Sequence, residues 1–239
     1  MGSSWEKIKV GDSEMRLYMS SPDSSERLPG IVVVPGQTGV NDFLQFSDMA
    51  AAKGYVVVAP DLYHRDPPDC KDDGPTRRQR LRDATVIQDI NAAVHFLRSR
   101  QSVDPGRIGI VGFCMGGRIV YLMSAVNPDI KAGVMYYGSD PFSPWGDGPA
   151  PFALTKDIQC PIMGHFGEDD VNPSPADMRK LDAELRRHGK VHEFYSYAGA
   201  EHAFANFGSA KYREHAAQTS WPRTFDFFAR HLGSRPELG

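Results

Sequence analysis

The chain has 239 residues, of which 41% are hydrophobic and 24% charged, and its formal net charge is -3. A chain of this size can bury a full core, so we expect one α/β domain spanning residues 1–239. The balanced charge, without a long run of lysine or arginine, argues against a nucleic-acid or anionic-membrane partner and favours a small molecule.

The first twenty residues predict an antiparallel hairpin. Residues 5–10 and 15–19 have strand character, and Gly11 and Asp12 between them form a favourable turn pair. We therefore expect an antiparallel edge ahead of the parallel strands.

The rest of the chain alternates between short apolar runs and helical patterns. Most of the runs are too continuous for half-exposed strands, so they indicate a sheet covered on both faces. They lie at residues 31–34, 55–59, 108–111, 132–137, 162–166 and 193–197. Apolar stripes predict helices over 86–97, 115–126, 178–185 and 221–232, while 65–75 and 138–151 read as loops. This alternation predicts parallel strands joined by crossover helices.

Cysteine usage and the N-terminus indicate a reducing compartment. The chain has three cysteines, Cys70, Cys114 and Cys160. An odd number of cysteines without metal-ligand spacing argues against a disulfide framework or a metal site. The first 17 residues lack a signal-peptide core, and no segment approaches the roughly 18 apolar residues of a membrane helix. We expect a cytoplasmic protein that is a monomer or a small homo-oligomer.

Cys114 lies where an apolar run gives way to a helical pattern, and glycines surround it. A nucleophile displayed on a strand-turn-helix corner needs such small neighbours. The corner aims the Met115 amide at an oxyanion and places the sulfur at a helix N-terminus, which favours thiolate. An isolated cysteine is more often a small buried hydrophobic residue. Gly112, Gly116 and Gly117 would start an ordinary helix poorly, however, so we favour the nucleophile.

In this fold a nucleophile is followed in chain order by an acid and then a histidine. His202, in a Gly- and Ala-rich segment after the last apolar run, is the candidate base. The acid is either Asp169 or Asp170, because a turn of one residue decides which carboxylate faces the imidazole. We choose Asp169, with Glu168 the least favoured, and three solvated acids at a loop tip remain the alternative. His165 lies inside an apolar run and is expected to be a core or pocket histidine.

Together these motifs resemble the dienelactone hydrolase family, a cysteine-nucleophile branch of the α/β-hydrolase fold. The matching segments are GFCMGG around Cys114, GED around Asp169 and GAEHAF around His202, with GVNDF and APDLYHR in the N-terminal half. The resemblance implies a mostly parallel sheet with helices on both faces. It also implies hydrolysis of an ester or lactone through an acyl-cysteine, without metal or organic cofactor.

Two positions depart from the family pattern. Lactone-cleaving bacterial members carry a glutamate that partners the thiol where this chain has Gly36, and an arginine for the substrate carboxylate where it has Asn206. The resemblance thus leaves thiol activation to His202 and the helix dipole, and it makes an anionic dienelactone a poor match.

Six residues are candidates for contact with the reacting group or substrate. The Gln37 amide should join that of Met115 in the oxyanion hole, because a backbone N–H does not depend on side-chain identity. The Gln37 side chain, Tyr137 and Asn206 are candidate substrate contacts. So are Arg82, from a cluster at residues 77–82 whose alternative is a solvated helix face, and Trp145, whose loop either lines a pocket or is anchored to the core.

The predicted function is hydrolysis of a lactone or carboxylic ester through Cys114, His202 and Asp169. One alternative is a thiol redox protein that uses Cys114, although neither Cys70 nor Cys160 is obviously placed as a resolving thiol. The other is a catalytically silent scaffold that binds a small ligand. The presence of Cys, Asp and His in the expected chain order argues against it.

Overall fold

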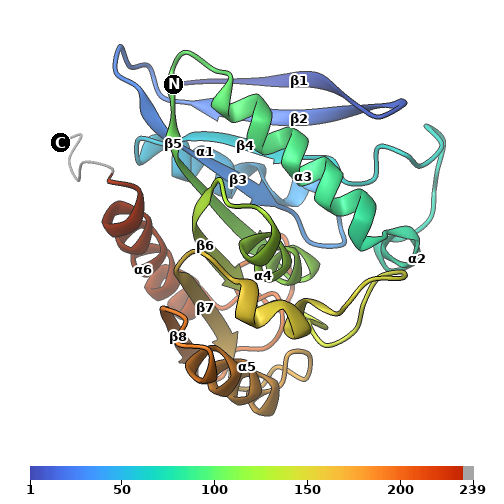
Figure 1. The fold of residues 1–239 in the computed structure, drawn as a ribbon, viewed down its shortest axis with the longest axis vertical. Coiled ribbons are helices and arrows are strands. Elements are labelled where there is room, and N and C mark those ends of the chain that lie inside the picture. The colour runs from blue at the N-terminus through green and yellow to red at the C-terminus, as the bar shows by residue number, and fades with distance from the viewer. Residues whose placement is uncertain (234–239) are drawn as a thin grey trace.

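A mixed sheet of eight strands forms the centre of the structure, a computed structural model that describes residues 1–233 (Figure 1). The strand order is β1-β2-β4-β3-β5-β6-β7-β8. The pairs β1/β2 and β2/β4 are antiparallel, and all later neighbours are parallel. The strands are β1 (Gly2–Val10), β2 (Ser13–Ser21), β3 (Leu28–Val34), β4 (Val56–Pro60), β5 (Val103–Phe113), β6 (Ile130–Tyr136), β7 (Ile162–Gly167) and β8 (His192–Tyr197). The predicted hairpin and the mostly parallel sheet are confirmed.

Helices cover both faces of this sheet (Figure 1). On one face a core of buried side chains includes Val86 of α3, Ile119 of α4 and Leu181 of α5. On the other face Phe46 of α1 and Phe227 of α6 belong to a second core. The helices are α1 (Leu44–Ala52), α2 (Gly74–Arg80), α3 (Asp83–Arg98), α4 (Met115–Val126), α5 (Pro175–Arg187) and α6 (Glu214–Leu232), with 3-10 turns at Val40–Phe43 and Pro151–Asp157.

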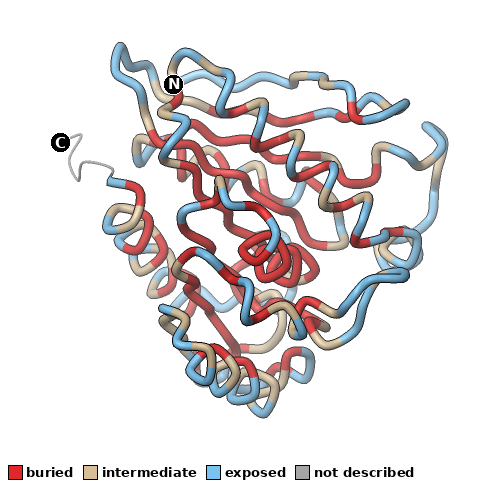
Figure 2. The backbone as a smooth tube through the Cα atoms, in the orientation of Figure 1, coloured by how far each residue is buried: buried red, intermediate tan, exposed pale blue. Residues whose placement is uncertain are grey.

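The continuous apolar runs reflect burial on both sides of the sheet. In β3, Val32 and Val34 belong to one core, whereas Ile31 and Val33 belong to the other, and all four are fully buried. Figure 2 shows the central strands buried and the outer helix surfaces exposed. The run is therefore apolar at every position rather than at alternate positions, as expected for a covered parallel sheet.

Helix α1 was not predicted, and α2 was expected only as the alternative of a solvated helix face at residues 77–82. The first, α1, is short, and its buried side chains include Phe46, Ala50 and Ala51, which give a weak periodic signal. The second, α2, begins at the end of the predicted loop over 65–75, where the Asp73 carboxylate accepts a hydrogen bond from the Thr76 amide. It buries no residue, so its sequence lacks an apolar stripe.

The parallel arrangement brings the ends of six strands to one edge of the sheet. The segments that follow β3, β4, β5, β6, β7 and β8 all emerge there, because neighbouring parallel strands share a direction. Cys114 follows β5 directly, residues 168–170 follow β7, and His202 lies shortly after β8. Among the helices of residues 1–233, none has the length and apolarity needed to cross a membrane.

Candidate active site

The turn between β5 and α4 holds Cys114 in a strained backbone conformation. Its φ is 57° and its ψ is -120°, a region that residues other than glycine rarely occupy. A Cβ on Gly112 would lie 2.1 Å from the Gly116 carbonyl oxygen, and a Cβ on Gly116 would lie 2.2 Å from the Val34 carbonyl oxygen. The glycines are thus required by the close approach of β3, β5 and α4, which displays the thiol at the edge of the sheet.

The Cys114 thiol is partly exposed and lies within hydrogen-bonding reach of the His202 imidazole. The Ser139 hydroxyl oxygen is 3.8 Å from the sulfur, and the Met115 amide at the start of α4 also faces it. Burial alone would raise the pKa of the thiol. The hydrogen bond and charge of His202, with the donors of Ser139 and Met115, outweigh burial and lower that pKa below its ordinary value. These surroundings favour a negative charge on sulfur.

His202 is held from its other side by Asp170. His202 Nδ1 lies 2.9 Å from Asp170 Oδ2, and the Asp170 side chain is almost fully buried. The ring of Tyr137 packs edge-on against the imidazole, with centroids 5.1 Å apart. Burial alone would lower the pKa of His202, but hydrogen bonds to Asp170 and Cys114, and their charges, raise it to about 9. The three side chains form a continuous series from carboxylate to thiol.

The expectation that Asp169 faces the imidazole is wrong, because Asp170 does so. Asp169 is exposed, and its amide donates to the Ala200 carbonyl. In the turn after β7 the Asp170 amide donates back to the Gly167 carbonyl, and Asp170 Oδ1 accepts from the Asn172 amide at 2.9 Å. This turn directs Asp170 inward. Glu168, the least favoured candidate, is exposed and accepts from the Ser196 hydroxyl.

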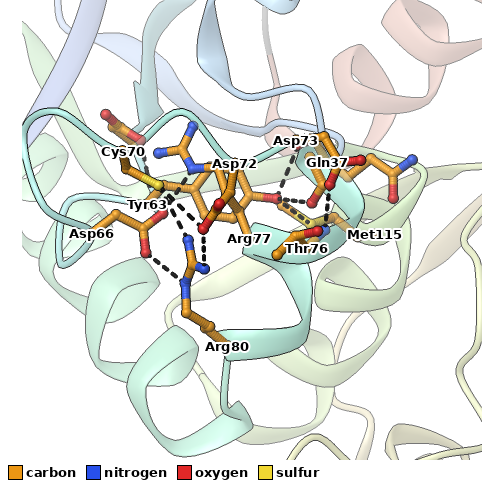
Figure 3. Close-up of polar contacts among 12 residues, drawn as sticks. Gln37, Tyr63, Asp66, Cys70, Asp72, Asp73, Thr76, Arg77, Arg80 and Met115 are labelled. Carbon is orange, nitrogen blue, oxygen red and sulfur yellow. Dashed lines mark hydrogen bonds and ion pairs between the residues drawn. The ribbon is translucent and has the colours of Figure 1, made fainter.

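The segment after β3 lies beside the thiol. A Cβ on Gly36 would be 3.5 Å from the Cys114 Cβ, so position 36 faces Cys114. The next residue, Gln37, accepts a hydrogen bond on its carbonyl oxygen from the Tyr63 hydroxyl at 3.0 Å. The same hydroxyl lies 3.6 Å from the Met115 sulfur. Figure 3 shows Tyr63 reaching both residues whose amides we expect in the oxyanion hole.

Tyr63 is a site residue that we did not predict. It is buried, and burial raises its pKa well above the ordinary value. The Arg77 guanidinium lies 4.1 Å over its ring, and Arg77 and Arg80 both pair with Asp66 (Figure 3). The signal available in the sequence was its place in APDLYHR, directly after a strand that ends at the same edge of the sheet.

The structure gives Arg82 and Trp145 contacts away from the three central side chains. Arg82 is exposed and donates to the carbonyls of Gln79 and Leu81. The Trp145 ring lies 3.9 Å from the guanidinium of the fully buried Arg118, so its loop is anchored to the core. Within residues 1–233, no contact joins either side chain to Cys114, His202 or Asp170.

Two further candidates for substrate contact are buried. Tyr137 is fully buried between His202 and Phe204, and its hydroxyl has no hydrogen-bond partner in the described part of the chain. Asn206 is nearly buried, and its side-chain oxygen accepts from the Gly208 amide at 3.0 Å. Both side chains therefore shape the loop around His202, and a role in substrate contact remains a prediction.

In the 77–82 cluster, Arg77 and Arg80 form ion pairs and Arg82 donates to backbone carbonyls, whereas Arg78 has neither kind of contact in the described residues. Its buried Nε has no hydrogen-bond partner there, and its charge acts on the Tyr63 hydroxyl. No cluster of three or more His, Cys, Asp or Glu side chains in residues 1–233 is arranged to hold a metal ion.

Comparison with known proteins identifies relatives along nearly the whole chain. The model of the "Dienelactone hydrolase family" matches residues 15–232. A "Putative carboxymethylenebutenolidase" from Methylorubrum extorquens is 32% identical over 94% of this chain and 80% of that protein. One of the same name from Escherichia coli is 31% identical over 94% of this chain and 85% of that protein. A crystal structure of a "Putative Dienelactone Hydrolase" from Klebsiella pneumoniae has a TM-score of 0.87 and 28% identity, and covers 96% of this chain and 100% of that one. The predicted α/β-hydrolase fold is confirmed.

Proposed function

The chain belongs to the dienelactone hydrolase family and is an ester or lactone hydrolase, and we propose that Cys114 is its nucleophile. His202 is the proton carrier, and Asp170 fixes the orientation of the His202 ring. The observation that supports this most directly is the contact series in which Asp170 binds His202 Nδ1 at 2.9 Å and His202 reaches the Cys114 thiol. Cys114, Asp170 and His202 come from three separate parts of the chain, in the order nucleophile, acid and histidine that other hydrolases of this fold have.

In the first half of the proposed reaction, the Cys114 thiolate attacks the carbonyl carbon of the ester. A carbon–sulfur bond forms, and the carbonyl π electrons move to oxygen, where the amides of Met115 and Gln37 stabilise the negative charge. When the carbon–oxygen double bond re-forms, the bond to the leaving oxygen breaks. The leaving alkoxide takes the proton of the His202 imidazolium, which leaves an acyl-cysteine and neutral His202.

In the second half, water attacks the thioester while neutral His202 takes a proton from it. The carbon–sulfur bond breaks, and the carboxylic acid and the thiolate are released. The hydrogen bond and charge of Cys114 help to raise the pKa of His202 to about 9 in the free enzyme. Acylation makes the sulfur neutral and removes both causes, so the pKa of His202 falls when the ring must act as a base.

The surroundings of the sulfur favour this reaction over the redox alternative. Cys160 is buried in the core on one face of the sheet, whereas Cys114 packs against the core on the opposite face. Cys70 contacts Asp72 and Arg80 on the surface. Neither thiol is placed to form a disulfide with Cys114. The thiolate-stabilising groups also argue against a silent scaffold, because a silent site has no need of a strained, activated cysteine.

We infer that neutral lactones and activated esters are accepted as substrates. Position 206 is Asn, and its side chain is engaged with the Gly208 amide, so it offers no positive charge to a substrate carboxylate. Any preference for an anionic substrate would fall to Arg78, whose buried Nε has no hydrogen-bond partner in the described chain. Matched neutral and anionic lactones test this directly, since a strict requirement for the anion would contradict it.

The proposed roles are tested by comparing Cys114→Ala, Asp170→Asn and Asp169→Asn with an activated aryl ester as substrate. We expect Cys114→Ala to abolish turnover, and Asp170→Asn to lower kcat by at least about a hundredfold, because the ring then loses its tautomer and its counter-charge. Asp169→Asn is the matched control, one residue away, and should keep wild-type activity. Full activity of Cys114→Ala would refute the nucleophile assignment.

A further inference from the structure

Ser139 contacts the nucleophile through both its backbone and its side chain. It lies in the segment after β6, and 4% of its surface is exposed. Its amide donates to the Cys114 carbonyl at 3.2 Å, and its hydroxyl oxygen is 3.8 Å from the Cys114 sulfur. A Cβ on Gly117 would lie 2.7 Å from the Gly138 Cα, so this segment rests directly on the first turn of α4. The position of the hydroxyl relative to the sulfur is therefore fixed by backbone contacts.

In the described part of the chain, the sulfur is the one hydrogen-bond partner of the Ser139 hydroxyl. Buried hydroxyl groups are normally paired, and a serine can donate its proton to an acceptor as soft as sulfur. A thiolate accepts more strongly than a neutral thiol, because hydrogen bonds to charged groups are the stronger ones. The contact thus favours the charged form of the nucleophile.

We propose that Ser139 is a catalytic residue whose hydroxyl donates a hydrogen bond to the Cys114 thiolate and keeps the nucleophile charged before substrate binds. This inference rests on the proposed function of Cys114. It explains how the thiol is activated although position 36, which faces the Cys114 Cβ at 3.5 Å, has no side chain. A carboxylate there would repel the thiolate, whereas a neutral donor stabilises it. Activation then does not depend on a charged group of the substrate, which agrees with acceptance of neutral esters.

The other groups around the sulfur do not duplicate this role. His202 carries the proton that must reach the leaving group, so it cannot hold the sulfur as a constant donor through the reaction. Tyr63 and Tyr137 also act on the sulfur electrostatically, but burial raises the pKa of each well above its ordinary value, so both stay neutral near pH 7. The Met115 amide faces the sulfur as well, yet the proposed reaction assigns it to the oxyanion.

The test is the pH dependence of Cys114 alkylation by iodoacetamide in the full chain, followed by mass spectrometry of the Cys114 peptide so that Cys70 does not contribute. Ser139→Ala should move the midpoint of the profile upward by about one pH unit, which is a tenfold loss of thiolate below the midpoint. Turnover of a neutral activated ester should fall by a similar factor at the same pH. Ser143→Ala, an exposed serine of the same loop, is the matched control and should not move the midpoint.

A second pair of variants separates hydrogen bonding from packing. Ser139→Thr keeps a hydroxyl and should retain the wild-type midpoint. Ser139→Val, which has the shape of the threonine variant without its hydroxyl, should shift the midpoint as Ser139→Ala does. If Ser139→Ala, or Val where Ala does not fold, titrates like the wild type, Ser139 does not stabilise the thiolate and the inference is wrong. That result leaves the proposed function intact, because loss of turnover in Cys114→Ala tests the nucleophile separately.

Discussion

Carboxamidomethylation of Cys114 should lower the pKa of His202. The modification replaces an ionisable sulfur with a neutral thioether of roughly the form that an acyl-enzyme presents. In the free enzyme the pKa of His202 is raised to about 9 although burial alone would lower it, and both Asp170 and Cys114 contribute to the increase. Only the Cys114 contribution is lost on alkylation, because the Asp170 contact at 2.9 Å lies on the other nitrogen.

The size of this effect follows from the strength of a charge-assisted contact. A hydrogen bond to a charged group is worth about 1.5–3 kcal/mol, and one pH unit corresponds to about 1.4 kcal/mol, so loss of the thiolate should lower the pKa by about one to two pH units. The His202 side chain is 24% exposed, and solvent screening favours the lower end of that range. We expect alkylated enzyme to titrate about one pH unit below the wild type, and still above the ordinary 6.5 because Asp170 remains.

An NMR titration of the imidazole Cε1 proton measures this directly. His202→Gln identifies the signal among those of the eight histidines. Treatment of Cys114→Ala with the same reagent is the control, because there the reagent modifies other cysteines and should leave the already lowered pKa of His202 unchanged. Superimposable titration curves for His202 in free and alkylated wild-type enzyme would refute the coupling on which deacylation is proposed to depend.

Two further predictions concern side chains behind the reacting groups. Tyr63→Phe removes the hydroxyl that donates to the Gln37 carbonyl at 3.0 Å but keeps the ring under Arg77. We expect kcat to fall about tenfold, because a hydrogen bond worth about 1.4 kcal/mol no longer positions Gln37. Steady-state and labelling assays should show an unchanged KM and an unchanged alkylation rate of Cys114. If Tyr63→Ala lowers kcat about tenfold and Tyr63→Phe leaves kcat unchanged, the role belongs to the ring and not to the hydroxyl. Burial lowers the pKa of His165 to about 3, so the folded protein does not take up the proton that the unfolded chain binds below 6.5. The free energy of unfolding should therefore fall by about 1.6 kcal/mol between pH 6.5 and 5. Urea unfolding of wild type and His165→Gln checks this, and an equally steep decline in the variant would contradict it.

Sequence patterns were sufficient for the sheet edge and for two of its three central side chains. The apolar runs located the parallel strands, and glycines at 112, 116 and 117 marked the turn that displays Cys114. His202 followed from its place after the last strand. These predictions succeed because strand ends and close backbone contacts depend on local residue types.

The carboxylate that faces His202 could not be chosen from the sequence, because backbone hydrogen bonds of one turn decide which one points inward. Asp169 and Asp170 are chemically identical and adjacent, and only the return of the Asp170 amide to the Gly167 carbonyl directs the second carboxylate inward. Ser139 was missed for a related reason. A small polar residue after a strand is common, and its contact with sulfur depends on how closely the segment after β6 approaches α4.

The loop over 138–151 shows why aromatic content alone could not decide between a pocket lining and an anchor to the core. Arg118, fully buried on α4, forms a bidentate pair with Asp83 and donates to the carbonyls of Asp140 and Ser143. A charge buried this deeply must be paired, so the loop supplies carbonyls and the Trp145 ring to satisfy it.

This anchoring also bears on the proposed role of Ser139. Arg118 lies one turn after Cys114 on α4, and it holds the loop immediately beyond Ser139 through the Asp140 carbonyl at 3.1 Å. Helix α4 therefore positions both groups, because the Cys114 thiol lies at its start and its Arg118 side chain holds the loop that carries the Ser139 hydroxyl. Removal of the guanidinium in Arg118→Met should release the loop and shift the Cys114 alkylation profile in the same direction as Ser139→Ala. An unshifted profile in a folded Arg118→Met variant would mean that the Gly117 and Gly138 backbone contact alone positions the hydroxyl.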